Sequence, residues 1–216
     1  MKNINVGVFG GYASGKTSLV EKLKQRKGMG AEGDIVFYSY KLRDVNVTLI
    51  DVPGDPRRIQ PMIFAANICD AALLTIDCSR GFDYQTGEAV IALTLAGVRK
   101  GIIALTKSDQ VTPEDVERLK TKVKALLKGT PFFDSPIYDV STLTGANIPQ
   151  LMDALAGLDI ERGQEGSFKM PVDHIIEPKS GFTVVTGIVE RGEVKSKDKV
   201  KLMPWNKEMI VQSIQI

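Results

Sequence analysis

The chain has 216 residues, of which 43% are hydrophobic and 25% are charged, and its formal net charge is +2. This composition is ordinary for a soluble globular protein, and the length exceeds that of one average domain. The small net charge provides no global field for nucleic acid, so an RNA partner would have to use a local basic patch.

The chain carries no sequence signal for a membrane or an oxidising compartment. No segment reaches the ~20 apolar residues that span a bilayer, and the first apolar run, residues 6–9, leads straight into glycines. Cys69 and Cys78 lie in apolar stretches without a CxxC pattern or a nearby histidine, which favours free thiols over a disulfide or zinc site. We expect a cytoplasmic protein without membrane contact, and nothing in the sequence indicates other than a monomer.

Residues 1–160 show short apolar runs that alternate with longer amphipathic ones. Strands are predicted at 4–9, 35–42, 45–50, 71–76, 101–106 and 136–140. Helices are predicted at 16–27, 56–67, 84–96, 113–128 and 148–158, the fourth with Thr112 as its cap and Pro113 at its first position. This order predicts an α/β domain with a mostly parallel six-stranded sheet covered on both faces. Ligands of such sheets bind at the carboxyl ends of the strands.

The composition and periodicity of the sequence change after residue 160. Residues 161–167 (ERGQEGS) are polar and glycine-rich, as in a linker. Residues 168–216 contain strand-like runs at 169–177, 183–190, 199–203 and 207–214 without helical periodicity, which predicts the start of an all-β module. Four such strands leave an apolar sheet edge exposed, so we expect the module to be incomplete and the natural protein to continue past Ile216.

Residues 10–17 (GGYASGKT, the phosphate loop) match the pattern GxxxxGK[ST] between a predicted strand and a predicted helix. Small residues there let backbone N–H groups surround a β-phosphate, and the helix N-terminus adds partial positive charge. Lys16 would reach the β- and γ-phosphates, and the Thr17 hydroxyl would bind Mg²⁺. A glycine-rich turn without a ligand is the alternative. The candidate phosphate-binding residues are Tyr12, Ala13, Ser14, Gly15, Lys16, Thr17 and Ser18.

Residues 51–54 (DVPG, the DxxG segment) close the predicted strand 45–50. Asp51 would hold Mg²⁺ through water, and the Gly54 N–H could donate to the γ-phosphate because glycine lets the backbone come close. The pattern alone is weak evidence, since Pro-Gly also favours an ordinary turn. It gains weight as the next element after a phosphate loop.

Residues 106–109 (TKSD, the TKSD segment) follow the predicted strand from its last residue and could bind the base of a nucleotide. The Asp109 carboxylate can accept two hydrogen bonds from guanine, whereas adenine would leave the charge unpaired at a cost of several kcal/mol. The Lys107 stem can cover the base face. Residues 141–143 (STL, the STL segment) would bring a backbone N–H to guanine O6. The candidate base-binding residues are Thr106, Lys107, Asp109, Ser141, Thr142 and Leu143.

Taken in order, GYASGKT, DVPG, TKSD and STL resemble the nucleotide signatures of translational GTPases of the elongation factor Tu type. Residues 79–81 (SRG), 85–86 (QT) and 95–101 (LAGVRKG) are similar to the same family. The TK-x-D form and GVRKG look most like the selenocysteine-specific elongation factors, in an archaeal-style version. In the second module, residues 170–173 (MPVD) and 183–192 (TVVTGIVERG) are similar to the opening of that family's second domain, a β-barrel.

The resemblance implies GTP and GDP as ligands, Mg²⁺ as cofactor, and an aminoacyl-tRNA and the ribosome as partners. It also implies a switch enzyme that hydrolyses GTP. The candidate catalytic residues are Lys16, Gly54 and Asp55, the last of which stands where the family has a catalytic histidine.

Three departures from the family predict slow intrinsic hydrolysis. Asp55 would repel a γ-phosphate and cannot donate a hydrogen bond to the transition state. Alternatively, Asp55 caps a helix that starts at Pro56. Ala13 replaces an aspartate, and no threonine lies between Ser18 and Thr48, so the usual switch I ligand is missing. The corresponding segment, residues 28–34, is short and glycine-rich, and it is either a mobile solvated loop or one in which Glu32 or Asp34 reaches a metal. A GTP-dependent binding module without efficient turnover is one alternative. A P-loop kinase or ATPase from another branch is another, against which Asp109 speaks.

Overall fold

The structure is a computed structural model that describes residues 2–24, 35–42, 44–55, 57, 59–160, 166–176, 183–187, 189 and 191–214. The chain divides into two compact units, Met1–Ile160 and Glu161–Ile216. The predicted loop 28–34, with Glu32 and Asp34 as alternative metal ligands, lies outside the described residues.

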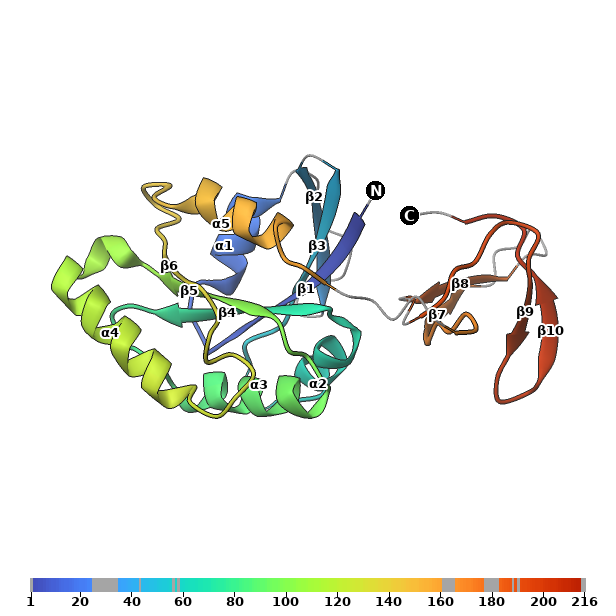
Figure 1. The fold of residues 1–216 in the computed structure, drawn as a ribbon, viewed down its shortest axis with the longest axis horizontal. Coiled ribbons are helices and arrows are strands. Elements are labelled where there is room, and N and C mark those ends of the chain that lie inside the picture. Colours follow the sequence, from blue (N-terminus) through green and yellow to red (C-terminus); the bar gives the residue numbers. More distant parts are fainter. Residues whose placement is uncertain are drawn as a thin grey trace. The chain divides into compact units, whose positions relative to one another are not determined.

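A six-stranded sheet forms the centre of the first unit (Figure 1). In chain order its strands are β1 Lys2–Gly10, β2 Val36–Leu42, β3 Val45–Asp51, β4 Ala71–Asp77, β5 Gly101–Thr106 and β6 Ile137–Asp139. They lie side by side in the order β2-β3-β1-β4-β5-β6, and only β2 runs antiparallel to its neighbour. The predicted α/β fold with a mostly parallel sheet is confirmed.

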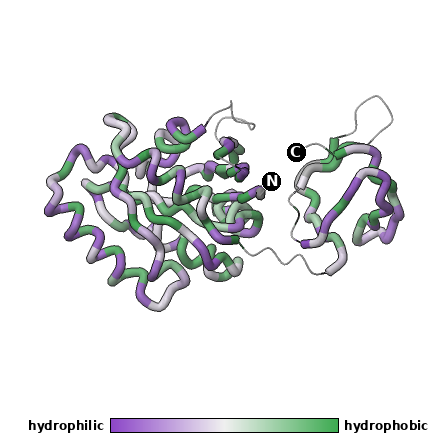
Figure 2. Tube along the Cα trace, turned by 45° about the horizontal axis from the view of Figure 1, so that its top comes forward, coloured by the Kyte–Doolittle hydropathy of each residue, from purple (hydrophilic) through white to green (hydrophobic). Residues whose placement is uncertain are grey.

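Helices cover both faces of this sheet (Figure 1). They are α1 Lys16–Leu23, α2 Ile59–Ile68, α3 Tyr84–Leu95, α4 Pro113–Leu126 and α5 Ile148–Ala156, with a short 3-10 helix η1 at Ser108–Gln110. One core cluster joins the sheet to α2, α3 and α4, and a second joins it to α1 and α5. Hydrophobic residues accordingly concentrate in the central strands (Figure 2).

The start of α4 follows the capping signal in the sequence. The Thr112 hydroxyl accepts a hydrogen bond from the Asp115 N–H at 3.2 Å, and Pro113 occupies the first helical turn. The Asp115 carboxylate accepts the Thr112 hydroxyl proton at 2.9 Å. Local chemistry therefore sets where this helix begins.

The start of α2 differs from the prediction. The helix begins at Ile59, whereas the sequence favoured a start at Pro56 with Asp55 as the cap. Asp55 instead accepts a hydrogen bond from the Arg57 N–H at 3.0 Å, which closes a short turn before the helix. A capping side chain accepts the N–H two residues on in this same way, so the role of Asp55 as the cap stays a prediction, although the described helix begins at Ile59.

The described part of the second unit contains two hairpin-like strand pairs. β7 Val172–Ile176 pairs with β8 Val184–Gly187, and β9 Lys199–Leu202 pairs with β10 Lys207–Ile210, both antiparallel. β9 and β10 are shorter than the predicted runs 199–203 and 207–214, while the predicted runs 169–177 and 183–190 extend into residues outside the described ones. They form two separate two-stranded sheets among the described residues instead of the single open sheet expected.

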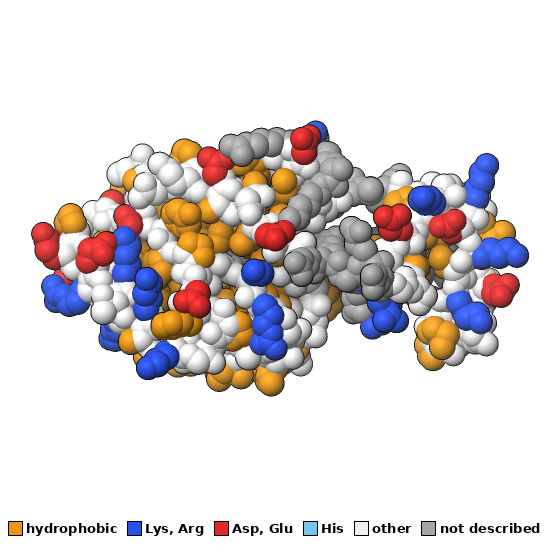
Figure 3. Space-filling view, viewed as in Figure 1, with side chains coloured by type: hydrophobic (Ala, Val, Ile, Leu, Met, Phe, Trp, Pro, Cys, Tyr) orange, Lys and Arg blue, Asp and Glu red, His pale blue; other side chains and the backbone are white. Residues whose placement is uncertain are grey.

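No helix among the described residues is long and apolar enough to cross a membrane. Cys69 and Cys78 are both free and partly buried, in line with the sequence. On the face drawn in Figure 3, basic and acidic side chains of the first unit are interspersed over the surface. This agrees with the small net charge.

Candidate functional site

The phosphate loop, the DxxG segment and the TKSD segment meet at one edge of the sheet. β1 ends at Gly10, β3 at Asp51 and β5 at Thr106, and these strands run parallel with β4 between β1 and β5. The register pairs Gly10 with Thr75 and Asp77 with Thr106. The three predicted segments therefore share the carboxyl edge that parallel sheets use for ligands.

Buried hydroxyl groups fasten the phosphate loop to the sheet. The Ser14 hydroxyl lies 2.8 Å from the Thr75 hydroxyl, and the Thr106 hydroxyl donates to the Ser14 carbonyl at 2.6 Å. All three side chains are buried, so these bonds lie in a low-dielectric environment where they are strong. Ala13 and Gly15 adopt left-handed backbone conformations, with φ of 58° and 86°. Gly15 directly precedes α1.

Lys16 is buried at the start of α1, with its ammonium inside the phosphate loop. Its Nζ donates to the carbonyls of Gly10 at 2.8 Å and Gly11 at 2.7 Å. Burial lowers the pKa of Lys16 to about 8, and the nearby charges of Asp51 and Asp83 oppose that shift. The loop thus holds a desolvated cation that an anionic ligand would stabilise.

Thr17 and Asp51 lie together, although they are distant in sequence. The Thr17 hydroxyl donates to Asp51 Oδ2 at 3.1 Å. Asp51 Oδ1 is buried and has no hydrogen-bond partner among the described residues. Burial raises the pKa of Asp51, while the Thr17 hydrogen bond and Lys16 lower it. An unsatisfied buried carboxylate oxygen beside a hydroxyl is a suitable partial ligand set for a hard cation.

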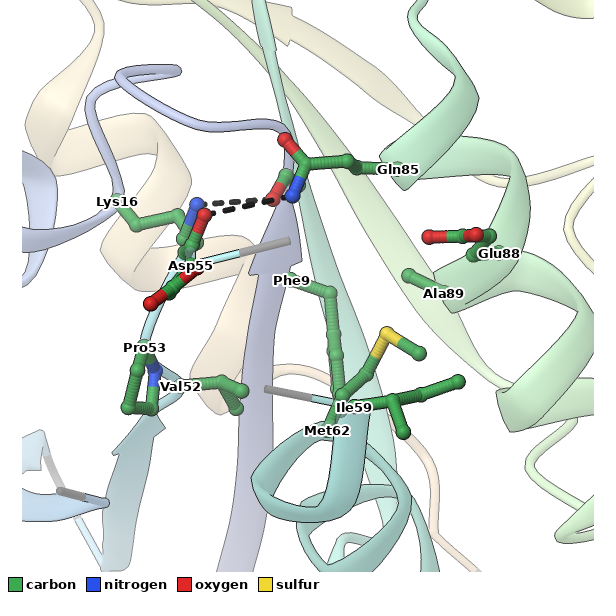
Figure 4. Close-up of a pocket in the computed structure, with 12 residues that line it drawn as sticks. Phe9, Lys16, Val52, Pro53, Asp55, Ile59, Met62, Gln85, Glu88 and Ala89 are labelled. Carbon is green, nitrogen blue, oxygen red and sulfur yellow. Dashed lines mark hydrogen bonds between the residues drawn. The ribbon is translucent and has the colours of Figure 1, made fainter. Parts of the chain in front are cut away.

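The DxxG segment closes against the phosphate loop. A Cβ built on Gly54 would lie 2.9 Å from Lys16 Nζ, so a side chain at this position would require the lysine ammonium to move. Gly54 and Asp55 line a pocket of about 410 Å³, together with Lys16, apolar residues of β1 and α2, and Gln85 and Glu88 of α3 (Figure 4). The Asp55 carboxylate pairs with the Arg57 guanidinium at 3.2 Å.

The TKSD segment is tied to the phosphate loop by Lys107. Its Nζ donates to the Ala13 carbonyl at 3.0 Å and to Asp77 Oδ2 at 2.6 Å. Burial alone would raise the pKa of Asp77, but hydrogen bonds from Lys107 and Ser79 outweigh it and hold that pKa below its usual value. The stem of Lys107 is thereby fixed between two strand ends.

Asp109 lies in η1, the short helix that begins directly after Lys107, and its side chain is exposed. The STL segment lies beside it, because the Ser108 N–H donates to the Val140 carbonyl at 3.2 Å. Ser141 is buried and its hydroxyl accepts the Thr144 N–H at 3.1 Å, whereas Leu143 is exposed. The predicted base-binding residues therefore lie at the same sheet edge as the phosphate loop, while the exposed side chains of Tyr12 and Ser18 point to solvent.

Three further groups at the site carried no predicted role. Thr75 and Asp77 hold the phosphate loop and Lys107 in place, and Gln85 contacts both the phosphate loop and the DxxG segment. The signal for the first two was a hydroxyl and a carboxylate at the end of an otherwise apolar strand. Gln85 gave no such signal, because its role depends on where α3 packs.

Comparison with known proteins agrees with this geometry. The sequence profile described as "Elongation factor Tu GTP binding domain" matches residues 34–158, more than half of the chain. This chain belongs to the elongation factor Tu GTP-binding family. Its first unit is therefore a GTP-binding domain of that family, and the resemblance seen in the sequence is confirmed.

Within this family the chain is similar to selenocysteine-specific elongation factors. It is 36% identical over its whole length to one from Methanocaldococcus jannaschii, covering 49% of that protein. It superposes with a TM-score of 0.86 and 36% identity on the Methanococcus maripaludis SelB structure in complex with the GTP analogue GPPNHP, covering 47% of that chain. A bacterial selenocysteine-specific elongation factor gives a TM-score of 0.88 at 27% identity, covering 38% of that chain. The chain thus spans half or less of the length of these relatives.

The lowered pKa of Lys16 predicts a pH-dependent affinity for GDP. A bound phosphate favours the ammonium form, so affinity should be flat below about pH 7 and weaken above pH 8 by up to about tenfold per unit. Measuring the dissociation constant of GDP between pH 7 and 9 tests this. The matched control is Lys16→Arg, which stays charged throughout and should show a flat profile. Equal pH profiles for both proteins would contradict the prediction.

Proposed function

We propose that this chain binds GTP and GDP at the described sheet edge and is the nucleotide switch of a translation elongation factor. The observation that carries this is the convergence of the phosphate loop, the DxxG segment and the TKSD segment on neighbouring parallel strands. Each segment supplies a different part of a guanine nucleotide site.

The phosphate end uses the backbone of the phosphate loop and Lys16. Upon binding, the ammonium exchanges the carbonyls of Gly10 and Gly11 for phosphate oxygens, which offset its charge far better. The N–H groups of residues 12–18 and the start of α1 surround the β-phosphate. The Gly54 N–H reaches the γ-phosphate, so it distinguishes GTP from GDP.

Thr17 and Asp51 fit a magnesium ion. Thr17 offers a hydroxyl, and Asp51 offers a buried oxygen without a partner among the described residues, a donor set of hard oxygens. The described residues contain no cluster of three or more His, Cys, Asp or Glu side chains that could hold a metal ion. Phosphate oxygens and water would therefore complete the coordination of the magnesium ion. Magnesium bound there neutralises charge on the β- and γ-phosphates.

The base end uses Asp109, Lys107 and the STL segment. Asp109 is exposed and free to accept two hydrogen bonds from the N1–H and the exocyclic amine of guanine. The Lys107 stem, fixed between Ala13 and Asp77, offers an apolar cover for the base face. A backbone N–H of residues 141–143 meets guanine O6.

Replacement of Asp109 by asparagine tests the base assignment. The asparagine amide replaces one of the two acceptor oxygens by an NH₂ donor that faces a guanine donor, so Asp109→Asn should weaken GDP binding by about 2 kcal/mol or more, roughly thirtyfold. The new NH₂ group can donate to the C2 carbonyl of xanthine, so XDP binding should improve. Calorimetry with GDP, XDP and ADP measures both effects. The control Asp134→Asn makes the same chemical change at an exposed turn, and an unchanged GDP preference in Asp109→Asn would refute the assignment.

We further propose that the GTP-bound protein carries an aminoacyl-tRNA to the ribosome in the cytoplasm, acting as a monomer. The support is the similarity over the whole chain to selenocysteine-specific elongation factors, including the second unit. The GTP state would expose or order the tRNA-binding surface through the DxxG segment, and hydrolysis would release the tRNA.

A filter-binding assay tests the tRNA proposal. With a non-hydrolysable GTP analogue bound, the chain should retain an aminoacylated tRNA more tightly than the same tRNA without its amino acid. The preference should disappear with GDP. Equal retention of charged and uncharged tRNA in both nucleotide states would contradict delivery and favour a different partner.

Intrinsic GTP hydrolysis should be slow because of Asp55. Its carboxylate lines the pocket beside Lys16 and Gly54, yet it is already engaged by the Arg57 guanidinium and N–H. A carboxylate adds like charge near a γ-phosphate and provides no hydrogen-bond donor for the transition state. A GTP-dependent binding module without efficient turnover is the second candidate function, and this observation favours it.

Asp55→His should accelerate hydrolysis by at least about tenfold, because an imidazole can orient water and removes the negative charge. Phosphate release in a single turnover, with and without ribosomes, measures the effect. Asp55→Asn is the matched control that removes the charge alone, and it should recover only part of the gain. A wild-type rate equal to that of Asp55→His would show that Asp55 does not limit turnover.

A further inference from the structure

Gln85 joins two loops that bind different parts of the nucleotide. Its Oε1 accepts the Tyr12 N–H of the phosphate loop at 2.7 Å. Its Nε2 donates to the Gly54 carbonyl of the DxxG segment at 3.3 Å. Figure 4 shows the side chain reaching from α3 over the pocket toward Lys16. One carboxamide therefore bridges the two loops with both of its polar atoms.

The bridged loops lie in direct contact. A Cβ built on Gly54 would lie 2.9 Å from Lys16 Nζ and 3.6 Å from Tyr12 Cα. Lys16 itself is bonded to the carbonyls of Gly10 and Gly11. In this arrangement the DxxG segment lies next to the lysine ammonium, the group that the proposed site uses to bind phosphate.

The helix that presents Gln85 begins at a fixed point. Asp83 caps α3, with Oδ1 accepting the Thr86 N–H and the Thr86 hydroxyl at 2.8 Å each. A Cβ on Gly11 would collide with the Asp83 carboxylate, so the helix start is packed directly against the phosphate loop. Gln85 lies in the first turn after this cap, and its carboxamide is held relative to the phosphate loop.

GDP and GTP are expected to affect the hydrogen bonds of Gln85 differently. A diphosphate needs Lys16 to turn from the loop carbonyls, but it leaves the Gly54 carbonyl where it is. For a γ-phosphate to take a place beside Lys16, Gly54 would have to move away from the ammonium, and we expect this movement to break the hydrogen bond from Gln85 Nε2. The bridge therefore opposes the triphosphate selectively.

We propose that Gln85 is a positioning residue that ties the DxxG segment to the phosphate loop and so biases the protein toward GDP over GTP. This inference rests on the proposed guanine nucleotide site. Loss of the hydrogen bond between Gln85 and Gly54 should favour GTP. The arrangement with Gly54 beside Lys16 then loses one hydrogen bond, whereas the arrangement with Gly54 displaced loses none.

The test measures the affinities of GDP and of the non-hydrolysable analogue GPPNHP with magnesium by calorimetry. Gln85→Met keeps the length of the side chain without its hydrogen bonds, and Gln85→Ala serves as a second variant. Both should raise the affinity ratio of GPPNHP to GDP by about two- to tenfold, the effect of one neutral hydrogen bond. Tyr84→Ala, at the neighbouring exposed position of α3, is the control and should leave the ratio unchanged.

The affinity ratio of GPPNHP to GDP shows whether Gln85 links the two loops or only supports the phosphate loop. If Gln85 only supports the phosphate loop, both affinities fall together in Gln85→Met and Gln85→Ala, and the ratio stays constant, which overturns the proposal. A lower ratio overturns it as well. A wild-type protein that binds neither GDP nor GPPNHP removes the proposed function itself, and that result is seen before any variant is made.

Discussion

The site depends on the attachment of the phosphate loop to the carboxyl ends of β4 and β5. The hydroxyl of Thr106 donates to the Ser14 carbonyl at 2.6 Å, and the hydroxyls of Ser14 and Thr75 lie 2.8 Å apart. Thr106 is also the first residue of the TKSD segment. One buried contact therefore fixes the distance between the phosphate loop and the TKSD segment. This distance matters because we propose that the first binds the phosphates and the second binds the base of one nucleotide.

The charged side chains of this site, Lys16 and Asp51, favour ligand binding more than they favour the stability of the fold. Lys16 is buried against carbonyl groups, and its pKa is lowered to about 8, which is the sign of a cation that lacks a full counter-charge. The buried Asp51 keeps one oxygen without a partner among the described residues. Perturbed groups of opposite sign at one sheet edge are typical of functional sites. An anionic ligand with a divalent cation would satisfy both.

The sequence predicted what depends on local chemistry. Alternating apolar runs located the strands, and the cap at Thr112 located α4, because both signals act within a few residues. The start of α2 was predicted at Pro56, whereas the described helix begins at Ile59. The bridge from Gln85 to Tyr12 joins residues 73 positions apart, so it depends on the packing of α3 and could not be read from spacing. The last four strands pair with their neighbours in the chain, β7 with β8 and β9 with β10, and so form two sheets among the described residues instead of the one expected.

The most direct test follows backbone amides of the isotope-labelled chain by NMR during titration with GDP and magnesium. A guanine nucleotide at this sheet edge should shift the amides of the phosphate loop, together with those of Asp109 and the STL segment, and reach saturation at one nucleotide per chain. ADP at the same concentrations should leave the Asp109 and STL amides in place. Equal shifts with ADP, or shifts confined to the second unit, would contradict the assignment of this edge as a guanine nucleotide site.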